Sequence, residues 1–177
     1  MQKQNVEKAG EELFNFAIDR EDIKTLMAYL PEEAKITRST VEYELQILKI
    51  VMVGWSISYF LEKNPHKNSV GAHYWKAVND FSRELSSQAG LIIGRDIDYF
   101  QVLKERLDNY LDAVVKKPGA PEPAVVIGPE FARICGNETD IYTVMTGSRM
   151  VIAVTANVKS YLDARGIEQE ISSRNTE

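Results

Sequence analysis

Apolar side chains recur at helical spacing over most of the chain. In the first 30 residues, the apolar positions between Val6 and Ala17 share one helical face, and those between Ile23 and Leu30 share another. One uninterrupted helix would rotate the second set about 100° away from the first. The pattern therefore predicts two helices, with a break near Asp19.

Residues 40–63 are apolar around most of a helical circumference. Ser39 and Glu42 have the spacing of a capping box, and a proline at position 65 follows the segment. A helix that is apolar on several sides needs neighbours on several sides, so we expect it at the centre of the fold. Its length approaches that of a membrane span, but Lys49 near the middle would cost about 2.5–3.5 kcal/mol in a bilayer. We therefore expect no membrane span.

Two further amphipathic helices are predicted from the middle of the chain. Residues 69–89 carry one continuous apolar stripe, with Ser69 as its expected cap and Gly90 as its expected stop. Residues 96–117 carry another and end before Pro118. Both helices have a polar opposite face, as expected for the outside of a bundle.

Residues 118–129 contain four of the six prolines, which predicts an extended strap. A short helix closed by Gly136 should follow, then a long helix over residues 138–164 capped by Asn137 and ended by Gly166. The β-branched residues of 142–155 and the turn signal around Gly147 leave a hairpin as the alternative there.

Together these elements predict an all-α fold: a bundle of five or six helices, with a proline-rich crossover before a long C-terminal helix. The 177 residues are expected to form one helical domain. Its parts would be N-terminal helices over 1–117, the strap over 118–129, C-terminal helices over 130–166 and a frayed tail over 167–177.

Composition narrows the classes of partner and compartment. The 21 basic residues against 26 acidic ones give a net charge of −5 without a basic block, so nucleic acid is not an expected partner. Cys135 is the only cysteine and cannot form an internal disulfide, and the first residues lack the apolar region of a secretory signal. These features favour a cytoplasmic protein.

A polar stripe on the apolar central helix is the first candidate site. Glu42, Gln46 and Lys49 share one side of residues 40–63, and Trp55 and Tyr59 supply aromatic side chains nearby. If the stripe is buried, these five residues could line a pocket for a small polar ligand, because buried polar groups need partners. If it is exposed, it is the hydrated side of the helix.

A second candidate is a metal site formed by His73, Asp80 and Glu84, which align along one flank of residues 69–89. The alternative is a solvated row of charges, because Lys76 and Arg83 lie close enough to pair with the acids. The sequence contains no nucleotide-binding or Cys-His motif, and no cofactor is predicted.

Three functional hypotheses follow. The leading one is a non-catalytic interaction or regulatory module that self-associates, most plausibly as a homodimer, because two helices carry an excess of apolar surface and no catalytic motif is found. The second is a helical bundle that binds a small molecule at the polar stripe. The third is a metal-dependent hydrolase that uses His73, Asp80 and Glu84 or another acidic cluster.

Overall fold

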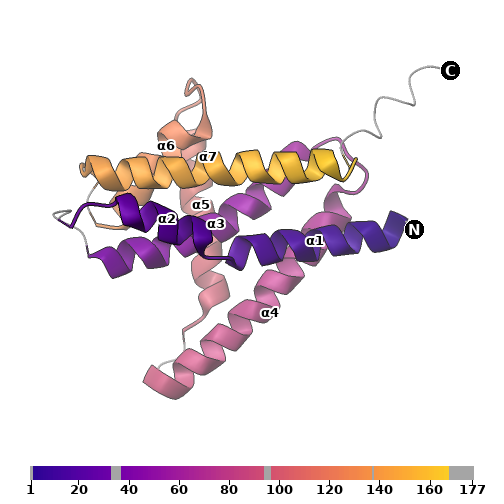
Figure 1. Ribbon diagram of the computed structural model, residues 1–177, viewed down its shortest axis with the longest axis horizontal. Helices are drawn as coiled ribbons and strands as arrows, with labels where there is room; N and C mark the ends of the chain where they lie inside the picture. Colours follow the sequence, from indigo (N-terminus) through magenta and orange to yellow (C-terminus); the bar gives the residue numbers. More distant parts are fainter. Residues whose placement is uncertain (1, 33–36, 94–96, 137, 168–177) are drawn as a thin grey trace.

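The computed structural model describes residues 2–32, 37–93, 97–136 and 138–167, and every regular element in these ranges is an α-helix (Figure 1). This confirms the all-α prediction. The described helices number seven, where five or six were expected. They are α1 (Gln2–Ile18), α2 (Glu21–Tyr29), α3 (Arg38–Phe60), α4 (Lys67–Ile93), α5 (Tyr99–Val115), α6 (Pro123–Ile134) and α7 (Ile141–Ala164).

The helix α3 lies at the centre, as predicted, and contacts each of the other six helices. All side chains of residues 47–53 are buried, so this helix has no solvent-facing side over nearly two turns. In Figure 1, α6 and α7 pack above α3, while α1 and α4 pack against each other below it. The apolar circumference read from the sequence thus corresponds to contacts on all sides.

Several helix ends differ from the prediction. The break near Asp19 is confirmed, because its carboxylate accepts a hydrogen bond from the backbone N–H of Glu21, the first residue of α2 (3.0 Å). Ser39 and Ser69 are not caps, since α3 and α4 each begin upstream of them. Gly90 does not end α4, which continues to residue 93.

The predicted extended strap is wrong over its second half, because α6 begins at Pro123. Proline suits the first turn of a helix, where its missing N–H would have no partner. Pro129 lies inside α6 and cannot donate to the carbonyl of Val125 one turn earlier. Val125 is 56% exposed, so this carbonyl lies in a solvent-facing part of the helix. The prolines therefore predicted an extended segment at the place where helix α6 begins.

The hairpin alternative for residues 142–155 is excluded, because the whole segment belongs to α7. The glycine that signalled a turn serves helix packing instead. A Cβ on Gly147 would approach the ring of Phe131 to 2.7 Å, and one on Gly128 would come within 2.8 Å of the backbone oxygen of Val144. These two glycines let α6 and α7 pack closely.

The C-terminal part ends as the glycines predicted, with different caps. Gly136 and Gly166 adopt positive φ (100° and 67°) after α6 and α7. Asp140 caps α7 by accepting from the N–H of Thr143 (3.0 Å), while the predicted cap, Asn137, lies outside the described residues.

The prediction of a frayed tail over 167–177 is wrong for its first residue. Ile167 is buried and its carbonyl accepts from the Asn64 amide, because it packs where α3 and α4 meet. Residues 168–177, the rest of the predicted tail, lie outside the described part of the chain. Nowhere in that part is a helix both long and apolar enough to cross a bilayer.

Candidate functional site

The polar stripe of α3 faces the corner between α1 and α2, where Lys49 is buried, Gln46 is partly buried and the Glu42 side chain is 43% exposed. Lys49 is fully buried, and its ammonium donates to the backbone oxygen of Asp19 (2.9 Å) and pairs with the carboxylate of Asp22 (2.9 Å). The same ammonium lies 4.4 Å from the centre of the Phe16 ring. Phe16 lies at the end of α1, Asp22 at the start of α2, and Asp19 in the link between them.

The other two stripe residues serve the same corner. The Gln46 amide donates to the backbone oxygen of Ala17 (2.9 Å), a carbonyl that the end of α1 leaves without a helical donor. Glu42 pairs with Arg20. All three polar side chains therefore bind the protein itself, and their contacts fix the direction of the chain between α1 and α2.

Trp55 and Tyr59 lie in a different place from the stripe. Their rings stack with centres 4.9 Å apart on the C-terminal half of α3. They line a groove of about 330 Å³ between α3, the start of α6 and the middle of α7. The five residues predicted to share one pocket are thus divided between a satisfied polar corner and an apolar groove.

The groove opens onto an apolar surface formed mainly by α7. Ile141, Met145 and Ile152 follow one another at spacings of four and seven on the side of α7 that faces solvent, and each is 42–59% exposed. Tyr59 (60% exposed) shares the groove lining with Ile152. We call the surface formed by these side chains and Val125 the α7 face.

Val125 joins this surface through the contact between α6 and α7. The preceding residue, Ala124, accepts a hydrogen bond at its backbone oxygen from the hydroxyl of Ser148 (3.0 Å). The backbone at Ala124 and Val125 therefore lies next to Ser148 of α7, and the Val125 side chain is 56% exposed. The α7 face thus combines side chains from three helices that are distant in sequence.

Three charged side chains lie at the α7 face and its groove: Arg149, Glu122 and Lys159, which pairs with Asp163 (3.1 Å). Arg149 is exposed one turn before Ile152, and Glu122 lines the groove at the start of α6. Within the described ranges, neither Arg149 nor Glu122 has a hydrogen-bond or ion-pair partner. The surface therefore carries one unpaired positive and one unpaired negative group.

The three residues of the predicted metal site line one shallow groove between α1 and α4, but each contacts its own neighbour. His73 shares a hydrogen bond with the backbone oxygen of Ser69 (2.7 Å), and Asp80 pairs with Lys76 (3.0 Å). Glu84 accepts from Gln88 on the same helix (3.4 Å). Among the described residues, no group of three or more His, Cys, Asp or Glu side chains is placed to hold a metal ion.

A buried polar cluster between α3, α5 and α6 was not foreseen. Glu44 is 4% exposed and accepts two hydrogen bonds from Arg106 (2.8 Å each), which joins α3 to α5. Burial, together with the negative charge of Glu44, raises the pKa of the Cys135 thiol to about 12. That thiol stays protonated near neutral pH and is a poor nucleophile. Since Glu44 and Arg106 are 62 residues apart, no local pattern indicated the pair.

The chain shows no match to a known protein family, a characterised protein or a solved structure.

Proposed function

We propose that this chain is a non-catalytic interaction module that self-associates as a homodimer through the α7 face. The observation that carries the proposal is the exposure of large apolar side chains from α3, α6 and α7 on one surface, beside an apolar groove. Contiguous apolar patches of this kind on soluble proteins typically mark interaction sites, because covering them removes apolar area from water.

A second copy of the chain is the partner that this surface fits. In a two-fold interface the same patch contacts itself, so it must carry both protruding side chains and the hollows that receive them. Ile152 and Tyr59 protrude beside a groove of about 330 Å³ whose walls they share. One copy can therefore insert a side chain into the other while receiving the equivalent side chain in return.

The charges of the α7 face are also self-complementary. Arg149 and Glu122 have opposite signs and no partner among the residues that the structure describes. A two-fold axis that passes between Arg149 and Glu122 would bring Arg149 of one copy toward Glu122 of the other, and would do so twice. Such crossed pairs favour the symmetric partner over an unrelated protein.

Light scattering of the full chain across a concentration series tests this proposal. We expect a dimer that dissociates on dilution, and a monomer at the same concentrations for Ile152→Glu, because the new carboxylate would have to be buried in the interface. Val115→Glu is the matched control: this α5 side chain is 76% exposed and lies outside the α7 face, so the dimer should persist. A wild-type chain that stays monomeric at high concentration overturns the proposal.

A small apolar ligand in the groove is the alternative, and the stacked rings of Trp55 and Tyr59 are the observation that favours it. Flat aromatic walls suit a planar hydrophobic molecule. In that case Trp55→Ala would abolish ligand-induced fluorescence changes without changing the oligomeric state measured by light scattering. A dimer that Trp55→Ala weakens, with no ligand response in the wild type, favours self-association.

A cytoplasmic setting remains part of the proposal. The only thiol of the chain is buried, so the fold uses no disulfide between its own residues. The third hypothesis, a metal-dependent hydrolase, gains no support from the contacts of His73, Asp80 and Glu84 described above.

A further inference from the structure

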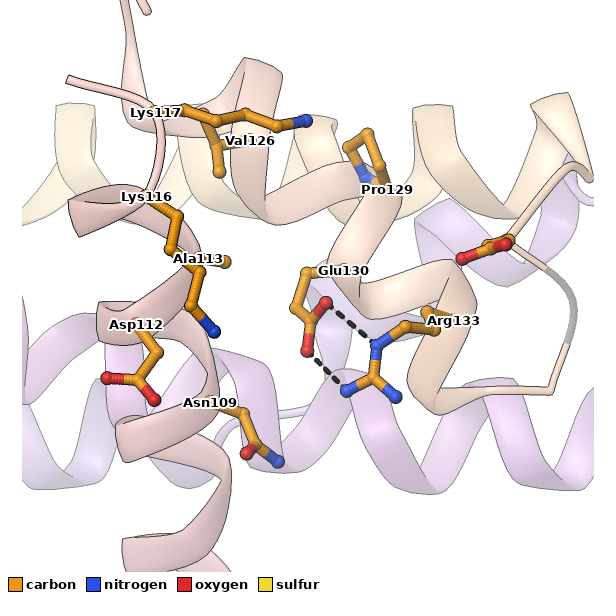
Figure 2. Close-up of a pocket in the computed structure, with 10 residues that line it drawn as sticks. Asn109, Asp112, Ala113, Lys116, Lys117, Val126, Pro129, Glu130 and Arg133 are labelled. Carbon is orange, nitrogen blue, oxygen red and sulfur yellow. Dashed lines mark hydrogen bonds and ion pairs between the residues drawn. The ribbon is translucent and has the colours of Figure 1, made fainter.

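Two clefts of the molecule differ in how the carboxylates in their linings are paired. In the cleft between α5 and α6, of about 380 Å³, the Glu130 carboxylate accepts two hydrogen bonds from Arg133 (2.9 and 2.6 Å; Figure 2). The Lys116 ammonium also points toward this carboxylate in Figure 2. The groove at the α7 face contains Glu122, for which the described ranges hold no hydrogen-bond or ion-pair partner. Glu122 is therefore available to a group from outside the chain.

A row of exposed side chains runs beside this groove along α7, which extends along one side of the molecule (Figure 1). Its members alternate at spacings of three and four residues and are Tyr142, Met145, Arg149, Ile152, Ala156 and Lys159. The three large apolar members, Tyr142, Met145 and Ile152, are 42–52% exposed. Core positions of a coiled coil, where two helices pack along their lengths, have this spacing. We call these six side chains the α7 row.

The two halves of the α7 row complement each other when a second α7 runs in the opposite direction. A two-fold axis that crosses α7 between positions 150 and 151 sets each member of one half against a member of the other half. The pairs formed between the copies are Tyr142 with Lys159, Met145 with Ala156, and Arg149 with Ile152. The long side chain of Met145 thus meets the smallest side chain of the row.

The methionine of this central pair has a place to enter. Ala156 belongs to the lining of the groove, and the stacked rings of Trp55 and Tyr59 line it as well. Because Ala156 is small, a longer side chain opposite it can reach into the groove. Methionine suits such a wall, since its side chain is flexible and its sulfur makes favourable contacts with aromatic rings.

The charges of the row favour the antiparallel direction. In a parallel two-fold pair every member of the row would meet its own copy, which sets Arg149 against Arg149 and Lys159 against Lys159. In the antiparallel pair Arg149 lies against Ile152, and Ile152 shares the groove lining with Glu122. The opposite charges of Arg149 and Glu122 then approach each other twice, once on either side of the axis.

We infer that α7 packs antiparallel to α7 of a second copy, and that Met145 of each copy fills the groove of the other. This inference rests on the self-association proposed above and specifies which side chains meet. The occupant of the groove is then a methionine side chain of the same protein. The pairing also covers the exposed apolar side chains of both rows, which a separate chain leaves in water.

Disulfide formation between two added cysteines tests the direction and the register. Met145→Cys and Ala156→Cys chains are oxidised separately and after mixing, where light scattering shows dimers, and free thiols are alkylated before denaturation. We expect a crosslinked dimer from the mixture only. Two copies of the same position would lie about 16 Å apart along the paired helices, whereas a disulfide joins Cα atoms within about 7 Å. The wild type, with its buried Cys135, should not crosslink.

Exchanging the sizes of the central pair is a second test, which needs no crosslink. Met145→Ala should weaken the dimer about tenfold because the groove loses its occupant, and Ala156→Met about as much because two long side chains meet. The double variant should return to within about threefold of the wild type, since each pair again combines a long and a small side chain. Val115→Ala, on exposed α5 surface, is the control and should change nothing. Sedimentation equilibrium measures the four dissociation constants.

Three results would overturn the pairing: a crosslink from either cysteine variant alone, a dimeric mixture that forms none, or a double variant no tighter than the single ones. In each of these cases the chain still dimerises, so the proposed self-association stands and only the arrangement of α7 fails. A wild type that is monomeric in light scattering instead removes the proposed function and this inference together.

Discussion

The polar stripe of α3 and the apolar outer side of α7 both contain side chains in an environment that does not match their polarity. Lys49 is fully buried, whereas Ile152 is 52% exposed. The buried lysine has two oxygen partners within 2.9 Å, and its charge is compensated by Asp22. The exposed isoleucine lies in a patch with other apolar side chains and beside a groove.

This contrast shows that a polar group in the interior and an apolar group on the surface do not indicate function equally well. A buried charge that is fully paired within the chain has a structural explanation and leaves nothing for a ligand. An exposed apolar patch has no such explanation inside the chain, since covering it would release free energy. The α7 face is therefore the stronger indication of a function.

Removing the buried ammonium of Lys49 should have the largest effect on the free energy of unfolding. Lys49→Ala leaves a cavity and deprives the Asp19 carbonyl and Asp22 of their donor, so we expect the free energy of unfolding to fall by about 3 kcal/mol in urea denaturation. Lys49→Met, which fills most of the volume, should lose less. Lys24→Ala breaks an exposed pair and should leave the free energy of unfolding nearly unchanged. Equal stability of Lys49→Ala and wild type would contradict this account.

Filling the close contact between Gly128 of α6 and Val144 of α7 should have the next largest effect on the free energy of unfolding. Gly128→Ala should lower the free energy of unfolding by about 2 kcal/mol, because its Cβ would meet the backbone oxygen of Val144. Gly71→Ala is the matched control: no atom lies within 4 Å of its Cβ position in α4, so alanine should stabilise the helix by about 0.5–1 kcal/mol. Thermal denaturation of both variants checks the opposite signs, and a shift of both in the same direction would argue against close packing at Gly128.

The charged residues at the α7 face allow a sharper test of the proposed self-association. Arg149→Glu should weaken the dimer about tenfold, or about 1.4 kcal/mol, because it places like charges together twice in a two-fold interface. Combining it with Glu122→Arg should restore the affinity, since the crossed pairs reform with reversed sign. Sedimentation equilibrium measures both dissociation constants. A double variant no tighter than the single one would rule out this pairing.

The smallest effect concerns the C-terminal end of α7, which polar contacts hold against α1. A hydrogen bond from Tyr161 (2.5 Å), together with Arg165, lowers the pKa of Glu12 below its ordinary value of 4.5. The stabilisation is therefore present above about pH 4.5 and is lost as the pH falls through the lowered pKa. We expect Glu12→Gln to cost under about 1 kcal/mol at pH 7 and less as the pH falls. Glu11→Gln, an exposed neighbour, should show no such pH dependence in urea denaturation.

Helical periodicity predicted the fold class well and the candidate sites less well. The break at Asp19, the central position of α3 and the stops at Gly136 and Gly166 followed from local rules that act within one or two turns. The extended strap was wrong because a proline at the first turn starts a helix as readily as it ends one. Gly147 indicated a turn because glycine is common in turns. Its actual role, close packing against Phe131, depends on a contact between two helices that the local sequence does not show.

The sequence alone determined that this protein is helical, where most helices lie and that α3 is surrounded, because these properties depend on the spacing of apolar residues within a helix. Only the tertiary structure decided what each polar or apolar side chain faces. Lys49 has its partners at the corner between α1 and α2, and Tyr59 meets Ile152 across nearly a hundred positions of the chain. The packing of helices brings such residues together, and contacts between distant segments leave no periodic trace in the sequence.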